Sequence, residues 1–229
     1  TNIAALLGAR SLRHAYSLGY LKAMVETDEL KEVRDEAANS LNAILADLDG
    51  SSTVDAAKAY FLGQAREFYL KPYRNPFDNR KYSPMVYELQ AGQVVGTRVA
   101  AFQVSEAMAS QCLLEALRLD PSFTAARVYT LCNDAARLAE YDENESWYSQ
   151  QDEFEDVKAV LSGQKAYTNL VLRNRQLSAP ASVLYAAIGQ AALDGRGEVA
   201  RTLIRAAHTI GLRGEVPAAL VEALEDENS

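Results

Sequence analysis

The chain is poor in the side chains that build metal centres and disulfide frameworks. Its 229 residues include two cysteines, Cys112 and Cys132, and two histidines, His14 and His208. Two cysteines cannot form a disulfide framework or a four-ligand zinc site. Both lie in stretches with helical periodicity, so we expect them to be buried as small apolar residues; two thiols facing each other across one helical hairpin are the alternative. We expect no metal site and no cofactor.

Long apolar runs and an excess of positive charge are also missing. No stretch approaches the roughly 18 consecutive apolar residues of a membrane-spanning helix, and no basic segment followed by an apolar run opens the chain. The 31 acidic and 23 basic residues give a formal net charge of -8, which disfavours nucleic acid and membranes as partners. The composition, 48% hydrophobic, is typical of a soluble globular protein. Because the first residue is Thr1, a processed protein and a fragment both stay open, and the localisation is unassigned.

The usual signatures of catalysis and nucleotide binding do not occur. The sequence has no G-x-x-x-x-G-K, G-x-S-x-G or H-E-x-x-H motif. Residues 195–200, GRGEVA, match the G-x-G-x-x-A form of the dinucleotide fingerprint, but helical residues precede them instead of the strand that such a site requires. We interpret them as a turn in which glycines stop one helix. Residues 142–156 are acidic but lack the spacing of an EF-hand loop, which favours a polar connector leading into a helix.

Apolar residues recur at three- and four-residue steps through most of the sequence, as in amphipathic helices. Capping residues, prolines and glycines indicate where each helix ends. The predicted helices cover about 2–25, 28–48, 52–70, 102–119, 121–141, 152–172, 180–193 and 198–210, with a short terminal helix from Pro217. Many helices with short connectors predict an all-α fold of stacked antiparallel helical hairpins, an α-solenoid, forming one domain over residues 1–229. A compact multi-helix bundle is the alternative.

Three prolines interrupt the helical pattern. Pro72, Pro76 and Pro84 remove backbone donors and restrict the residues before them, so residues 71–84 cannot form a regular helix. Residues 85–89 and 93–99 are then rich in β-forming residues and are separated by an Ala-Gly pair, which predicts a small β-hairpin. We expect residues 71–100 to be a proline-rich loop and β-hairpin inserted in the helical domain.

Two short segments resemble helical repeats. One segment resembles the second helix of a HEAT repeat; it contains Val33, Arg34, Ala37, Ala38, Leu41 and Ile44. The other resembles the end of a tetratricopeptide repeat; it contains Ala109, Ala116, Leu117, Leu119, Asp120 and Pro121. The aromatic and glycine positions of the first tetratricopeptide helix are missing upstream. The chain therefore resembles a divergent helical-repeat protein, and this resemblance implies a scaffold that binds a partner.

Aromatic and basic residues gather in one segment. Residues 60–87 hold eight of the nineteen aromatic residues, and between residues 66 and 82 five bases face two acids, a local reversal of the overall charge. Tyrosine and arginine are enriched at binding hot spots, and loops held by a rigid scaffold often carry recognition. The predicted partner-binding residues are Tyr69, Lys71, Tyr73, Arg74, Arg80, Lys81 and Tyr82. As alternatives, the aromatics anchor the loop onto the helices, or they stack on single-stranded nucleic acid.

Three functions are compatible with these observations. The preferred one is a non-enzymatic scaffold that binds a protein or peptide partner. The second is an all-helical enzyme or small-ligand protein with a groove between hairpins that uses His14, Tyr16 or the region of Tyr69. A closed pocket with convergent polar groups of perturbed pKa would favour this second function. The third is a structural segment of a larger protein.

Overall fold

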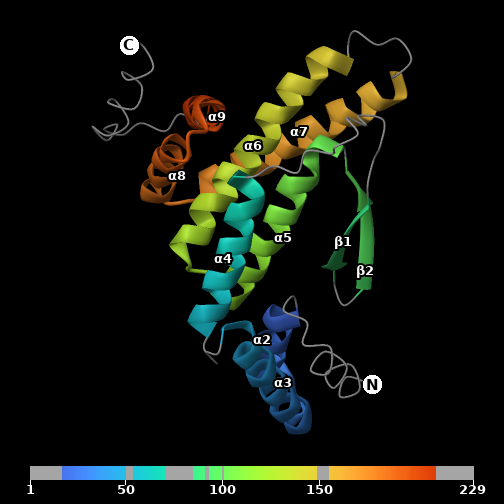
Figure 1. Cartoon of the computed structure of the whole chain (residues 1–229), viewed down its shortest axis with the longest axis vertical. Coiled ribbons are helices and arrows are strands. Elements are labelled where there is room, and N and C mark those ends of the chain that lie inside the picture. The colour runs from blue at the N-terminus through green and yellow to red at the C-terminus, as the bar shows by residue number, and fades with distance from the viewer. Residues whose placement is uncertain are drawn as a thin grey trace. The chain divides into compact units, whose positions relative to one another are not determined.

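The structure, a computed structural model, is predominantly α-helical, as the sequence predicts (Figure 1). It describes residues 17–49, 54–70, 85–90, 93–99, 101–148 and 155–209. The helices are α2 Leu18–Thr27, α3 Lys31–Asp49, α4 Val54–Leu70, α5 Val104–Leu119, α6 Thr124–Tyr148, α7 Glu155–Ser178, α8 Ala181–Leu193 and α9 Gly197–Thr209, with the 3-10 helix η2 at Ala101–Gln103. The part of helix 2–25 before residue 17 and the helix predicted from Pro217 lie outside the described residues. Within the described part, no helix has the length and apolar character needed to cross a bilayer.

Two strands lie in the segment that the sequence predicts to be β-rich. β1 Met85–Gln90 pairs antiparallel with β2 Gln93–Arg98. Met85 is paired with Arg98, and Gln90 with Gln93. The proline-rich residues 71–84 that precede β1 are outside the described residues.

Helix α6 begins later and ends later than predicted. It starts at Thr124 instead of residue 121 because Asp120 forms a turn, in which its Oδ1 accepts a hydrogen bond from the Ser122 amide at 2.9 Å. It continues to Tyr148, through residues predicted to be a polar connector. One cause is Lys165 of α7, whose Nζ lies 2.7 Å from the Asp142 carboxylate and also pairs with Glu145. This lysine compensates the acids one turn apart on α6.

The chain divides into two compact units, residues 1–67 with 109–126 and residues 68–108 with 127–229. In the first unit α2 packs on α3, and the buried side chains of α3 include Val33, Ala37, Ile44 and Leu45. The single domain predicted over residues 1–229 stays a prediction.

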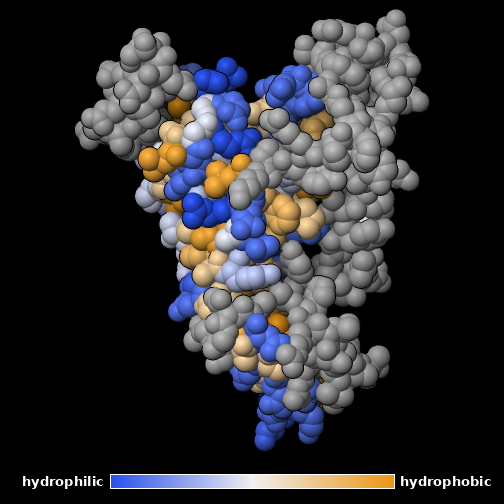
Figure 2. Space-filling model, viewed as in Figure 1, coloured by the Kyte–Doolittle hydropathy of each residue, from blue (hydrophilic) through white to orange (hydrophobic). Residues whose placement is uncertain are grey.

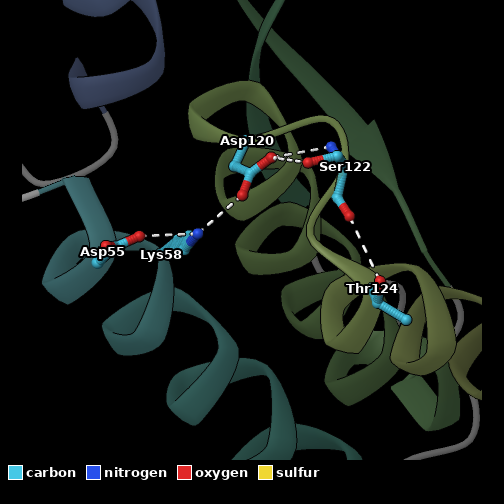
Figure 3. A network of polar contacts seen from close by, with 5 residues as sticks. All are labelled: Asp55, Lys58, Asp120, Ser122 and Thr124. Atoms are coloured by element: carbon cyan, nitrogen blue, oxygen red, sulfur yellow. Dashed lines mark hydrogen bonds and ion pairs between the residues drawn. The ribbon is translucent and has the colours of Figure 1, made fainter.

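A lysine cross-links two segments of the first unit (Figure 3). The Nζ atom of Lys58 lies 2.7 Å from Asp120 Oδ2 and 2.8 Å from Asp55 Oδ1, and 4.9 Å from the centre of the Phe123 ring. Hydrogen bonds from Lys58 and from Ser122 lower the pKa of Asp120 to about 2. The lysine therefore ties α4 to the turn that precedes α6.

In the second unit α6 and α7 run antiparallel. The Tyr141 hydroxyl of α6 donates to Gln164 Oε1 of α7 at 3.1 Å. Two turns earlier in α6, Asp134 forms an ion pair with Arg175 of α7. The earlier residue of α6 contacts the later residue of α7, so the two helices run in opposite directions. Figure 1 shows α6 and α7 alongside each other. α9 packs against both α8 and α7. As expected, both cysteines are buried and neither forms a disulfide; the Cys132 thiol donates to the Ala187 carbonyl at 3.3 Å.

Candidate functional site

Tyr69 is the one predicted partner-binding residue that the structure describes, and it lies in the interior. Its side chain is 1% exposed. A side chain with so little exposed surface cannot contact a partner directly, so including Tyr69 among the contact residues is corrected. The predicted contacts Lys71, Tyr73, Arg74, Arg80, Lys81 and Tyr82 lie outside the described residues and stay a prediction.

Arg196 holds the end of α4 through Tyr69. Its Nη1 donates to the Tyr69 carbonyl at 2.8 Å, and its guanidinium lies 4.7 Å from the centre of the Tyr69 ring. The ring of Tyr129 on α6 meets that of Tyr69 edge to face, with centres 5.7 Å apart. The last carbonyls of a helix have no partner within the helix and carry its negative dipole end, so an arginine stabilises this terminus doubly. The last turn of α4 is thus fixed at Tyr69, two residues before the segment 71–84 begins.

The position of Arg196 depends on a glycine turn between α8 and α9. Gly195 has φ 71°, a left-handed conformation in which a Cβ is unfavourable. The Arg196 amide donates to Ala191 O at 2.9 Å and the Gly195 amide to Ala192 O at 3.0 Å, the hydrogen-bond pattern of a Schellman motif. A helix precedes this turn, so the predicted interpretation of GRGEVA as an inter-helix turn is confirmed.

Two carboxyl groups meet inside the same unit. Glu106 of α5 is 0% exposed, and neither of its carboxyl oxygens accepts a hydrogen bond from an N–H or O–H group. Its side-chain neighbour is the carboxyl of Glu140 on α6. Burial and the charge of Glu106 raise the pKa of Glu140 to about 10, and burial also raises the pKa of Glu106. A proton shared by the two carboxyls would supply the donor that the Glu106 oxygens lack.

A polar network surrounds this carboxyl pair. Gln103 donates from Nε2 to Glu140 Oε2 at 3.1 Å and accepts at Oε1 from Arg137 Nε, also at 3.1 Å. Asn133 donates to the Glu106 carbonyl at 2.9 Å. Arg137 and Arg196 both lower the pKa of Glu106 through their charges, so two cations partly balance the two acids.

Sequence reasoning missed this polar network because it has no motif. The only signal was a stripe of polar residues, Asn133, Arg137 and Glu140, at helical spacing in a helix that is otherwise rich in apolar residues. Such a stripe normally indicates the solvent face of a helix. Only the pairing of α6 with Gln103 and Glu106 shows that Asn133 is buried and that Arg137 and Glu140 are half-buried.

The polar network around Glu106 and Glu140 offers acids and cations but no activated nucleophile. Burial raises the pKa of the Cys132 thiol to about 12 and raises the pKa of the Tyr69 phenol, which keeps both groups neutral at physiological pH. Among the described residues, no group of three or more His, Cys, Asp and Glu side chains is arranged to hold a metal ion. His208 lies, as predicted, in the last turn of its helix, α9, whereas His14 and Tyr16 are outside the described residues. What the carboxyl pair binds best is a proton.

Fold and cluster together define a helical protein with a buried polar network next to a fixed helix end. Comparisons with protein-family models, with curated proteins and with solved structures found no match to this chain.

Proposed function

We propose that the chain is a non-enzymatic scaffold that binds a protein or peptide partner through the segment 71–82. In this proposal antiparallel helical hairpins stack as in an α-solenoid, and the segment 71–100 is an insertion whose loop carries the contacts. The observation that carries the proposal is the anchoring of Tyr69 by Arg196 and Tyr129. It gives the aromatic and basic segment a fixed origin on a helical support, which lowers the entropy lost when the segment binds.

The way the second unit uses its polar residues also supports a rigid scaffold. Gln103, Arg137 and Asn133 join α6 to the start of α5, and Arg175 binds Asp134 between α7 and α6. Hydrogen bonds of this kind fix the relative positions of helices. A partner-binding surface benefits from such rigidity, because recognition residues then keep their spacing before the partner arrives.

The sequence of the segment indicates the chemistry of its partner. Arg74, Arg80 and Lys81 are spaced among Tyr73 and Tyr82. Arginine and lysine favour carboxylates, and tyrosine supplies large contact area at little entropic cost. We therefore expect a partner segment that carries acidic side chains beside an aromatic or aliphatic anchor.

A peptide selection tests this proposal. Peptides would be selected from a random phage-displayed library on the parent protein, and the Kd of the enriched peptides measured by fluorescence polarisation. The variant Arg74→Glu/Lys81→Glu should weaken binding at least about tenfold. The matched control Lys31→Glu/Arg173→Glu makes the same charge change at two exposed positions of α3 and α7, and it should leave Kd unchanged. Equal loss in both variants, or no enriched peptide, would contradict the proposal, provided circular dichroism shows equal helicity.

One observation favours a second function, a helical enzyme or small-ligand protein. The Glu106–Glu140 pair combines burial with pKa values raised for both groups, a combination enriched at functional sites. A thermal-shift screen with a small-molecule panel tests this function, with Glu106→Gln as the control. A compound that raises Tm of the parent but not of Glu106→Gln would support a ligand site at the pair. Equal shifts in both proteins would argue against it.

A further inference from the structure

The strands β1 and β2 form a sheet of two strands, so each strand has an outer edge. They pair along their whole length, from Met85 with Arg98 to Gln90 with Gln93, without a bulge. Among the described residues no third strand joins this sheet. A hairpin of two strands is only marginally stable in water, and a third strand stabilises it. The hairpin therefore gains stability from a strand that is added to it.

The register determines which backbone groups point to the outer edge of β2. In an antiparallel pair, residues that exchange hydrogen bonds alternate with residues that do not. Gln90 and Gln93 are separated by two residues, and the pair that closes such a short loop exchanges hydrogen bonds. Counted from this pair, the N–H and C=O groups of Val94, Gly96 and Arg98 do not bond to β1 and point outward. They repeat about every 6.8 Å, as the groups of any extended chain do.

Gly96 distinguishes the outer edge of β2 from that of β1. It lies in the middle of β2 and is exposed, whereas β1 contains no glycine. Glycine inside a strand often marks a place where another backbone approaches closely. β2 also has no lysine, no proline and no bulge, which are devices that keep natural edges from pairing. The outer edge of β2 is therefore suited to pair with another strand.

Exposed apolar side chains do not indicate a binding surface in this way. Figure 2 shows apolar residues, in orange, among hydrophilic ones on the face in view. Exposed leucines such as Leu193 of α8, which is 84% exposed, are normal in folded proteins and do not indicate what would cover them. A row of N–H and C=O groups without a backbone partner does, because an extended backbone has complementary donors and acceptors at the same spacing.

We propose that the outer edge of β2 binds an extended segment of another protein, which adds a third strand to the sheet. Backbone hydrogen bonds supply the affinity in this mode of recognition, called β-augmentation. A second copy of the chain is disfavoured because each copy carries a formal net charge of -8, which opposes self-association. The segment needs N–H groups at alternate residues, so it has no proline there. The inference goes beyond the contacts of residues 71–82 and does not depend on them.

A scan of backbone methylation tests the proposal. Peptides would be selected by phage display on the parent and, separately, on Arg74→Glu/Lys81→Glu, and then synthesised with one N-methyl group at each position in turn. An added strand donates to β2 from every second residue. Kd measured by fluorescence polarisation should therefore rise at least about tenfold at every second residue and less than about threefold between them. The absence of this alternation, or of any enriched peptide, overturns the proposal.

The two selections separate this inference from the proposed function. A peptide that loses affinity for Arg74→Glu/Lys81→Glu but shows no alternation supports binding through residues 71–82 and overturns the addition of a strand. A peptide that shows alternation and binds both proteins equally supports the addition of a strand and contradicts the contacts of residues 71–82.

Two proline variants test whether the strand is added to β2. Gly96→Pro removes an outward N–H but no hydrogen bond to β1, as is tolerated at an edge, and should raise Kd at least about tenfold. Tyr87→Pro is the matched control on the outer edge of β1, because Tyr87 pairs with Gly96, and should leave Kd unchanged. Equal losses in both variants, or a parent dimer that Gly96→Pro dissociates in sedimentation velocity, overturn the proposal. Circular dichroism verifies that helicity is retained.

Discussion

Two carboxylates of this protein, Asp120 in the first unit and Glu106 in the second, have opposite electrostatic environments. Asp120 is bound by Lys58 and Ser122, and its pKa is lowered to about 2. Glu106 is fully buried beside another carboxyl group, and its pKa is raised. The protein therefore stabilises the charged form of Asp120 and the neutral form of Glu106.

The comparison separates a contact that stabilises the fold from one that costs stability. Lys58–Asp120 joins opposite charges and needs no other explanation. Bringing Glu106 and Glu140 together inside the protein opposes folding wherever both would be ionised. Violations of local rules in natural proteins cluster at functional sites, so the carboxyl pair is the more informative of the two.

Replacing Arg196 should have the largest effect, because this side chain serves both the end of α4 and the carboxyl pair. Arg196→Met removes the bond to the Tyr69 carbonyl, the ring contact and a balancing charge. We expect the free energy of unfolding in urea to fall by about 2–4 kcal/mol. Arg196→Lys keeps the positive charge but lacks the planar guanidinium, so its stability should lie between that of Arg196→Met and that of the parent. Equal stability of Arg196→Met and the parent would contradict the anchoring of Tyr69.

Glu106→Gln should raise stability at pH 8 by about 2 kcal/mol, because the amide supplies the missing donor to Glu140 and removes one charge. Glu67→Gln removes the same charge at an exposed position of α4 and is the control, expected to change stability by less than about 0.5 kcal/mol. Denaturant titrations of the three proteins measure the difference. Destabilisation by Glu106→Gln at pH 8 would show that the ionised pair is favourable and that our interpretation is wrong.

The same pair predicts how stability depends on pH. Because both pKa values are raised in the folded protein, folding takes up protons at the pair. Its favourable contribution is fully present below the unfolded glutamate pKa of about 4.3 and is lost as pH rises toward the Glu140 value of about 10. The parent should therefore lose stability between about pH 4.5 and pH 10, and Glu106→Gln should lose less over the same interval. Parallel profiles of the two proteins would contradict proton uptake by the pair.

The turn that carries Arg196 provides a smaller test. Gly195→Ala puts a Cβ on a residue with φ 71° and should lower stability by about 1 kcal/mol. Gly189→Ala is its counterpart in the middle of α8, where an added Cβ meets no atom within 4 Å, and should raise stability by about 0.5–1 kcal/mol. Thermal unfolding of both variants verifies the opposite signs, and equal signs would contradict the role given to Gly195.

The features that the sequence predicts well are local. Pro180 precedes α8, Gly195 ends it, and the periodic stretch from Val54 to Leu70 is a helix, because caps and breakers act within a few residues. The bond from Arg196 to Tyr69 joins residues 127 positions apart, and no periodicity encodes it. For the same reason Tyr69, which as an aromatic beside basic residues resembles a contact residue in the sequence, is a core residue in the fold.

Asp120→Asn should have the smallest effect, because both side chains of its ion pair with Lys58 are partly exposed to solvent, which screens charges. With its pKa lowered to about 2, Asp120 contributes stability above the unfolded aspartate pKa of about 3.9, and this contribution is lost as pH falls toward 2. The amide keeps an acceptor for Ser122 but not the charge that pairs with Lys58. Tm of Asp120→Asn should therefore lie slightly below that of the parent at pH 7 and converge with it near pH 2, whereas a difference that does not shrink with acid would assign the effect to the turn instead of the ion pair.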